Sequence, residues 1–341
     1  MESGPTTRSL PATTRAAGAD TFQILALDGG GIKGLFSAAV LAHLEEDLGI
    51  SVADHFDLLA GTSTGGIIAL ALAAGFRPRE IVQFYVANAG RIFPPKLFKS
   101  FSLRKLTHLF LRKYPSAPLQ EALREQFGDR LLRDCSKRVV IPSYNLDNDD
   151  VYVFKTRHHP RLRRDYREPI WKVAMATSAA PTYFPAFHEV DHIRLVDGGV
   201  WANNPAVVGI AEAVSMLEVP LESIRVFSLG TTEDVAKRSN RLTRGGQWQW
   251  RKAAVSVVMR GQSVGANAQA LHLLGRERLL RFNPSVPDKL FALDRLTEKE
   301  LMGRAASTSR ELAPDFKTRF CGHFAPQFEP IPASSEKGAT S

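Results

Sequence analysis

The sequence predicts an α/β fold with a mostly parallel central sheet, and three observations support that prediction. Between Phe22 and Gly75, short apolar runs alternate with helix-length runs, as in proteins whose helices pack on a parallel sheet. Both of the short runs end in glycine-rich turns. The chain has 341 residues with an apolar fraction of 44%, which is enough to bury one large core.

The first unit, residues 22–49, begins with the apolar run FQILAL and breaks at Asp28 into three glycines. Apolar residues at helical spacing follow from Leu35, and Gly49 ends that helix. The second unit, residues 55–75, holds the short run HFDLLAG, the turn Gly-Thr-Ser-Thr-Gly and the run GGIIALALAAG. The last run is apolar on every side, which is typical of a fully buried helix. We expect helices on both faces of the sheet.

The later elements follow from the same patterns. In order, we expect a helix over 118–127, two strands within 138–156, a helix over 171–180, strands in IRLVDGG and IRVFSLGT, and a mostly helical part over 251–312. Pro118 near the start and Gly128 after the end support the first helix, and Pro181 stops the second.

One domain is expected to hold all of these elements. The expected organisation is a leader over 1–20, a domain over 21–330 and a flexible tail over 331–341, with the core motifs in 22–230 and a helical part in 251–325. The leader is rich in Thr, Ala, Gly and Pro and has no charged start before an apolar core, so it predicts disorder and no secretory signal. Residues 233–250 predict a loop, and we expect the chain to fray from Pro326.

Composition narrows the setting of the protein. Two cysteines cannot form a disulfide framework and neither has a zinc-ligand spacing, so we expect a reduced, cytoplasmic setting and no metal. No apolar run reaches the roughly 18 residues of a membrane-spanning helix. The net charge of +9 favours anionic partners, either nucleic acid or an anionic membrane surface, without choosing between them. A basic protein with no such partner is an equally good interpretation.

The pentapeptide Gly61-Thr-Ser-Thr-Gly65 carries a candidate nucleophile, Ser63. A serine hydroxyl is a weak nucleophile until a base takes its proton. On a sharp turn from strand to helix, Gly61 and Gly65 leave room for the crossing of the two elements, and the helix N-terminus favours developing negative charge. The alternative is a structural glycine-rich turn. The apolar strand before it and the buried helix after it favour the nucleophile.

The run DGGGIKG, Asp28–Gly34, follows a strand and precedes a helix, so its backbone N–H groups can converge on an anion. It fits the weak dinucleotide pattern G-x-G-x-x-G. That pattern needs an acidic residue at the end of the second strand, where this chain has GTSTG. We therefore favour an oxyanion hole formed by Gly29, Gly30 and Gly31. Lys33 either adds positive charge for a phosphate group or is merely solvated.

Asp197 is the candidate base, because it follows an apolar strand and precedes Gly198 and Gly199. The alternative is an ordinary Asp-Gly turn. A Ser-His-Asp triad needs a histidine late in the chain. His272 lies in a helical context and His323 in a loop, and neither carries a motif, so a triad with His323 stays open.

Three motifs occur in the order Asp28–Gly34, Gly61–Gly65 and Asp197–Gly199. Together with ATSAAPTYFPAF and GGVWANNPA, they resemble the motifs of the patatin-like phospholipases over residues 22–230. The resemblance implies a three-layer α/β/α fold and metal-free hydrolysis of fatty-acyl esters by a dyad without histidine. It assigns Ser63 as nucleophile, Asp197 as general base and the three glycines as oxyanion hole. The supporting motif positions are Lys33, Gly34, Gly61, Gly65, Gly198 and Gly199.

Such a dyad is physically reasonable, since shelter from water raises the basicity of a carboxylate. Ser63 would form an acyl-enzyme, and water activated by Asp197 would then release the fatty acid. Residues 91–115 mix apolar and basic side chains, which suits a cap over an acyl pocket or a contact with an anionic membrane surface. A core-packing helix with a solvated basic edge is an equal alternative. The very basic residues 157–169 predict a solvated loop or, more specifically, a phosphate or nucleotide contact.

The C-terminal stretches GQSVGANAQALHLLGRERLLRFNP and FALDRLTEKELMGRAA resemble bacterial patatin-like effectors of anti-phage defence, the CBASS type. This resemblance implies an enzyme that stays silent until a cyclic dinucleotide such as cyclic GMP-AMP binds. It would then act peripherally on the inner membrane surface. Candidate activator-binding residues are Arg157, His158, Arg161 and Trp201.

Two alternatives remain, a constitutive lipid acyl hydrolase or esterase and a non-catalytic nucleotide-binding module that uses the glycine loop. No cofactor and no nucleic-acid polymer are expected, and a homo-oligomer is compatible with the sequence.

Overall fold

The structure is a computed structural model that describes residues 21–92, 114–234, 250, 254–286 and 298–332. The predicted leader over 1–20, most of the apolar and basic segment 91–115, and residues 333–341 of the predicted tail lie outside the described residues.

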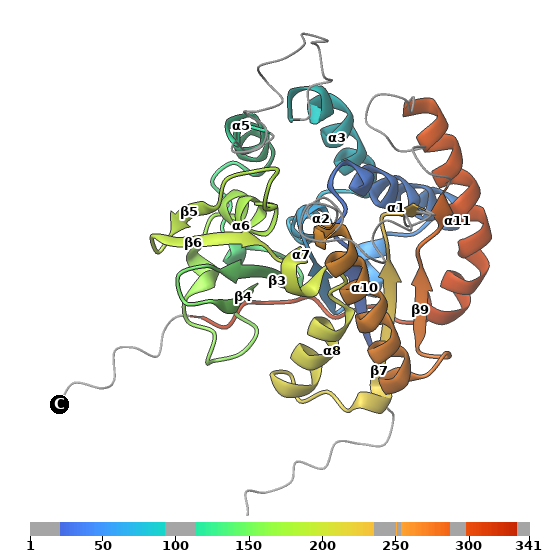
Figure 1. Cartoon of the computed structure of the whole chain (residues 1–341). Helices are drawn as coiled ribbons and strands as arrows, with labels where there is room; N and C mark the ends of the chain where they lie inside the picture. The colour runs from blue at the N-terminus through green and yellow to red at the C-terminus, as the bar shows by residue number, and fades with distance from the viewer. Residues whose placement is uncertain (1–20, 93–113, 235–249, 251–253, 287–297, 333–341) are drawn as a thin grey trace, which may run out of the picture.

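The described residues form a mostly parallel sheet of eight strands in the order β5-β6-β3-β2-β1-β7-β9, with β4 paired to β3 (Figure 1). The strands are β1 Phe22–Leu27, β2 Leu58–Gly61, β3 Arg138–Asn145, β4 Asp150–Lys155, β5 Phe187–Val190, β6 Ile193–Asp197, β7 Ile224–Leu229 and β9 Leu279–Phe282. Strands β1, β2, β3, β7 and β9 are mutually parallel, whereas β4 and β6 run antiparallel to β3. A separate parallel pair joins β8, Glu233–Asp234, to β10, Ser285–Val286.

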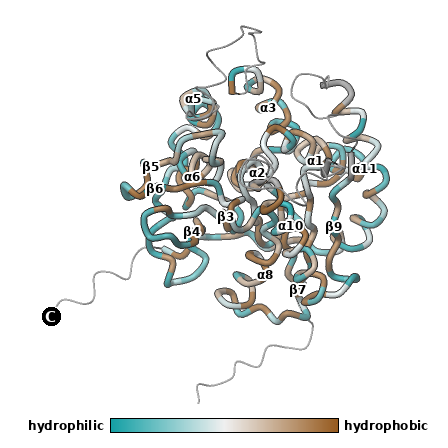
Figure 2. Tube along the Cα trace, in the orientation of Figure 1, coloured by the Kyte–Doolittle hydropathy of each residue, from teal (hydrophilic) through white to brown (hydrophobic). Residues whose placement is uncertain are grey.

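Helices cover both faces of this sheet, as predicted. Leu25 and Leu27 of β1 belong to a large core shared with α1, α2, α3, α5, α6 and α11. Ile24 and Ala26 of the same strand point the other way, into a smaller core with α8 and α10. The bounds are α1 Gly34–Leu48, α2 Thr64–Ala73, α3 Pro78–Ile92, α5 Ala117–Phe127, α6 Ile170–Thr177, α8 Ala206–Ser215, α10 Ala254–Leu274 and α11 Glu298–Phe320. Figure 2 shows the contrast between the largely hydrophobic α8 and the largely hydrophilic α11.

Helix α2 is buried along its whole length, as its apolar sequence predicts. It crosses β1 at very close range: a β-carbon on Gly65 would lie 2.2 Å from the backbone oxygen of Leu27. A β-carbon on Gly61 would lie 2.3 Å from the oxygen of Gly65. Both positions therefore need glycine for steric reasons, and the helix N-terminus is pressed against the carboxyl end of the sheet.

The structure adds to one expectation and corrects two others. Residues 251–312 contain α10 and the first part of α11, in agreement with a mostly helical part, but β9 adds a parallel strand beside β7. Helix α6 ends at Thr177, four residues before Pro181, since its last turn gives way to the turns at 178–184. The chain does not fray between Pro326 and residue 332: Phe328 is buried, and the N–H of Ile331 donates to the Arg157 oxygen.

No helix in the described part of the chain is both long enough and apolar enough to span a membrane.

The close crossing of α2 and β1 gives a matched pair of glycine substitutions. We expect Gly65→Ala to lower the free energy of unfolding by about 3 kcal/mol or more, because the added carbon meets backbone that cannot move away. Gly261→Ala, in α10, meets nothing within 4 Å and should raise it by about 0.5–1 kcal/mol through helix propensity. Urea unfolding curves measure both. Equal stabilities for the two variants would contradict the steric account.

Candidate active site

Two strands run toward each other along one edge of β3, and the candidate site lies where they meet. Strand β4 pairs with Val140–Asn145 on one edge. Strand β2 pairs with Arg138–Val140 and antiparallel β6 with Ser143–Asn145, so both must occupy the other edge. The carboxyl ends of β2 and β6 therefore face each other across a gap beside Pro142. This arrangement brings Ser63 and Asp197 together from positions 134 residues apart.

Ser63 sits on a strained turn between β2 and α2, with φ 55° and ψ −123°. A non-glycine residue with this backbone costs free energy and persists only where the surroundings hold it. Its N–H donates to Thr177 Oγ1 at 3.0 Å, and that hydroxyl donates to the Pro142 oxygen at 2.6 Å. The preceding Thr62 donates its hydroxyl to the oxygen of Ala202 at 2.6 Å. The turn is thus held by hydrogen bonds on both sides.

The Ser63 hydroxyl donates to Asp197 Oδ2 at 2.6 Å. The other carboxylate oxygen, Oδ1, accepts the N–H of Gly199 at 2.7 Å. Only 2% of Asp197 is exposed, and burial raises the pKa of its carboxyl to about 6, against the lowering effect of the Ser63 and Gly199 hydrogen bonds. A carboxylate tuned this way can accept a proton from an attacking hydroxyl near neutral pH.

The glycine run lies directly beside Ser63. A β-carbon on Gly29 would lie 3.2 Å from Ser63 Cβ. The N–H of Gly29 donates to the backbone oxygen of Asn203 at 3.0 Å, and that of Gly30 donates to Thr64 Oγ1 at 3.2 Å. Gly31 is the exposed member, with φ 59°. The run then passes through a short 3-10 turn, Gly31–Lys33, into Gly34 at the start of α1.

A buried ion pair fixes the start of this run, and the sequence analysis missed it. Arg281 of β9 donates to both oxygens of Asp28, at 2.7 and 2.6 Å, and also to Ser228 Oγ at 2.8 Å. Asp28 and the arginine side chain are 4% and 14% exposed. Residues 251–312 were expected to be mostly helical, so Arg281 could not be placed beside the glycine run.

Histidine does not reach Ser63 in the described part of the chain. His323 Nε2 lies 2.8 Å from Asp57 Oδ2, and its backbone oxygen lies 2.7 Å from His55 Nδ1. Asp57 immediately precedes β2, so this pair sits at the opposite end of that strand from Ser63. His272 is exposed on α10. The Ser-His-Asp alternative with His323 is therefore not assembled.

The four candidate activator residues are not gathered into one site. Arg157 and His158 follow β4, beyond the start of β3, and both are buried. His158 contacts Glu212 Oε1 at 2.9 Å, and the Arg157 guanidinium lies 4.9 Å from the centre of the Tyr166 ring. Trp201 donates to the Ser143 oxygen near the other end of β3, and Arg161 is exposed. Because β4 runs antiparallel to β3, its carboxyl end points away from Trp201.

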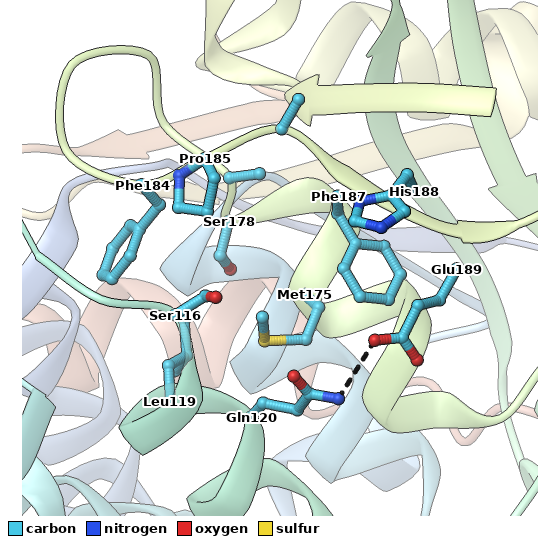
Figure 3. Close-up of a pocket in the computed structure, with 12 residues that line it drawn as sticks. Ser116, Leu119, Gln120, Met175, Ser178, Phe184, Pro185, Phe187, His188 and Glu189 are labelled. Carbon is cyan, nitrogen blue, oxygen red and sulfur yellow. Dashed lines mark hydrogen bonds between the residues drawn. The ribbon is translucent and has the colours of Figure 1, made fainter. Parts of the chain in front are cut away.

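A cavity of about 190 Å³ lies next to the residues that support the dyad. Figure 3 shows Phe184, Phe187 and Met175 around it, with the Ser178 and Ser116 hydroxyls directed inward. Gln120 donates to Glu189 at its rim at 3.2 Å. The wall includes Ala179, whose oxygen accepts the N–H of Asp197 at 3.0 Å. A hydrogen bond between two backbone groups therefore connects the cavity wall to the residue that carries the candidate base. No cluster of metal-ligating side chains occurs among the described residues.

Comparison with known proteins matches residues 25–210 to the family described as patatin-like phospholipase. A relative named cGAMP-activated phospholipase, from Pseudomonas aeruginosa, is 35% identical over 285 residues, which are 82% of this chain and 84% of the relative. A relative of the same name from Vibrio cholerae is 38% identical over 61% of this chain and 64% of its own. Among solved structures, VipD from Legionella pneumophila aligns with a TM-score of 0.48 and 13% identity, over 88% of this chain and 67% of that one.

The raised pKa of Asp197 predicts a pH-dependent gain in stability on its removal. Between the ordinary carboxyl pKa of 3.8 and about 6, the native state binds more protons than the unfolded state, so stability falls as pH rises through this window. Asp197→Asn lacks this penalty. At pH 8 we expect it to be more stable than the parent chain by about 2–3 kcal/mol, and near pH 4 by little.

Urea unfolding at both pH values measures this difference. Asp28→Asn is the matched control, because it breaks a buried ion pair and should lose about 3–5 kcal/mol at pH 8. If Asp197→Asn were less stable than the parent chain at pH 8, the buried carboxylate would not be lowering the free energy of unfolding.

Proposed function

The chain belongs to the patatin-like phospholipase family of hydrolases, and from this premise we propose that it cleaves fatty-acyl esters of membrane phospholipids with a Ser63–Asp197 dyad. The observation that carries the proposal is the 2.6 Å hydrogen bond from the Ser63 hydroxyl to a buried carboxylate whose pKa is raised to about 6. The strained turn adds support, because it presents the hydroxyl at the N-terminus of α2.

In the first half of the reaction, Ser63 Oγ attacks the ester carbonyl carbon while Asp197 takes its proton. The carbonyl oxygen becomes an oxyanion, which the N-terminus of α2 and the glycine run stabilise. Within that run we assign the N–H groups of Gly30 and Gly31 as donors, because the N–H of Gly29 donates to the Asn203 backbone oxygen. The hydroxyl of Thr64 is a side-chain acceptor for Gly30 and can be displaced by the stronger, charged acceptor. Collapse of the intermediate expels the lysolipid alcohol, which receives the proton from Asp197.

In the second half, a water molecule attacks the acyl-enzyme while Asp197 takes a proton from that water. The fatty acid then leaves, and Ser63 regains its hydrogen. The cavity beside Ser178 offers apolar side chains for part of the acyl chain, next to the strand that carries the base. Its volume of about 190 Å³ is smaller than ordinary ligand pockets, so we assign it a part of the acyl chain and not a whole chain.

We further propose that cyclic GMP-AMP activates the enzyme and that it serves bacterial anti-phage defence, acting peripherally on the inner membrane surface. The support is that the two relatives described above are named for cGAMP activation. The match to the first of them covers most of that relative's length. The net charge of +9 suits an anionic surface and an anionic activator alike.

Other functions receive less support. A non-catalytic nucleotide module would use the glycine run alone and would leave the buried hydrogen bond between Ser63 and Asp197 without a role. A constitutive lipid acyl hydrolase shares the dyad and differs only in the absence of nucleotide control.

The dyad predicts how turnover depends on pH. Hydrolysis of a small soluble ester should rise with pH as Asp197 loses its proton, with half of the maximal kcat/KM near pH 6. The measurement is kcat/KM for a p-nitrophenyl ester between pH 4.5 and 8.5. His323→Ala should leave the midpoint unchanged, which separates an aspartate from a histidine with a similar pKa. A midpoint that disappears in His323→Ala would restore the triad.

Lipid release tests both parts of the proposal. Vesicles containing phosphatidylglycerol are incubated with the protein, with and without cyclic GMP-AMP, and free fatty acid is measured. We expect release only with the nucleotide, and a loss of about 10³-fold or more in Ser63→Ala and Asp197→Ala. Full release without nucleotide would favour the constitutive alternative. Release that survives Ser63→Ala would contradict the assigned nucleophile.

A further inference from the structure

Asn203 lies between the dyad and the glycine run and is only 9% exposed. It follows the short helix α7, Gly199–Ala202, which begins two residues after Asp197. Its backbone oxygen accepts the N–H of Gly29 at 3.0 Å. Its side-chain Oδ1 lies 2.6 Å from the point that a Gly29 β-carbon would occupy, and Ser63 Cβ lies 3.2 Å from that same point. The Asn203 amide therefore faces the space beside the nucleophile.

The Asn203 amide has one satisfied end and one unsatisfied end. Nδ2 donates to Ser263 Oγ of α10 at 2.8 Å. Oδ1 is buried and has no hydrogen-bond partner in the described part of the chain. It also shares its surroundings with the base: Asn203 Oδ1 and Asp197 Oδ1 lie 3.2 and 3.0 Å from the point that a Gly199 β-carbon would occupy. A buried acceptor without a partner calls for a donor.

Rotation of the amide by half a turn would give Oδ1 a donor. A serine hydroxyl can donate as well as accept, so Ser263 can donate to Oδ1 in the turned arrangement. Nδ2 then points toward Gly29, Ser63 and Asp197, where its two hydrogens replace an acceptor oxygen. In that state Asn203 offers a hydrogen-bond donor to whatever negative charge develops beside Ser63.

The reaction needs such a donor. When Ser63 Oγ bonds to the carbonyl carbon, the carbonyl π electrons move to the oxygen and leave an oxyanion, while the proton passes to Asp197. Fixed donors aimed at that oxygen are a large source of rate acceleration. Two of the expected donors, the N–H groups of Gly29 and Gly30, are engaged with acceptors of the protein.

We propose that the Asn203 side-chain amide donates a hydrogen bond to the oxyanion formed by Ser63, and that Ser263 of α10 is the positioning residue that fixes its orientation. This rests on the hydrolase mechanism proposed above and adds a side-chain donor to it. It also gives α10 a function. Gln262, the residue before Ser263, donates to the Val200 oxygen of α7, so one turn of α10 contacts both α7 and the Asn203 amide.

The test compares Asn203→Ala and Ser263→Ala with Asn204→Ala, a matched control at the next buried asparagine. Asn204 Oδ1 accepts the N–H of Ala206 at the start of α8, so its loss should lower thermal stability and leave kcat within threefold. Asn203→Ala should lower kcat on a p-nitrophenyl ester about 100-fold with little change in KM. Ser263→Ala should lower kcat about tenfold, because the amide remains but loses its fixed orientation.

A second measurement separates a donor from a structural residue. Trifluoromethyl ketones bond reversibly to the serine and carry a negative oxygen in the place of the oxyanion, so their inhibition constants follow transition-state binding. Across the variants, the inhibition constant should rise by the same factor as kcat/KM falls. If a variant only damaged the structure, its activity would fall without a matching rise in the inhibition constant.

The inference is overturned if Asn203→Ala keeps kcat/KM within threefold, or if activity falls while the inhibition constant stays unchanged. Should Asn203→Ala fail to fold, Ser263→Ala decides by the same proportion. Labelling with a fluorophosphonate separates this from the mechanism itself. If the parent chain is not labelled at Ser63, with or without cyclic GMP-AMP, the dyad proposal fails. If the parent and Asn203→Ala are labelled equally fast, only the role of Asn203 fails.

Discussion

The site depends on one constraint of sheet geometry, the shared edge of β3. Strands β2 and β6 can end opposite each other only because each pairs with a different half of that edge. Pro142 lies in the gap, where its oxygen accepts from Thr177 and no strand among the described residues pairs with it on that edge. Each further feature follows from this meeting point: the turn at Ser63 must be sharp, α2 must start at once, and Asp197 must end its strand inside the protein.

Two features at that meeting point lower the free energy of unfolding, and interactions elsewhere in the fold offset them. Ser63 has a backbone that a serine rarely adopts, and Asp197 keeps a carboxyl group almost without water. Cores on both faces of the sheet and hydrogen bonds to Thr177, Ala179 and Gly199 hold these residues in place. Stability and reactivity are therefore in opposition here, as is common in enzymes whose active sites are buried.

The sequence predicted the parts of the protein in which local pattern and chain order decide the structure. Phe22–Leu27 and Ile193–Asp197 are strands as expected, and α2 is buried throughout. What could not be predicted depends on partners far along the chain. The four residues of β9 are too few for periodicity to separate strand from helix. Arg281 pairs with Asp28, which lies 253 residues earlier in the chain. Asn203 is recognised as a candidate only in the structure, where its side-chain oxygen is buried without a hydrogen-bond partner among the described residues. The candidate activator residues were chosen for their basic or aromatic character, and such character does not predict a shared location.

The ion pair between Asp28 and Arg281 has a consequence for how the protein is made. Synthesis from the N-terminus completes the nucleophile, the base and most of the sheet before Arg281 is translated. Until then β7 lacks its outer neighbour, and the head of the glycine run lacks the ion pair between Asp28 and Arg281. A nascent chain thus holds every reacting group without the loop beside them being fixed.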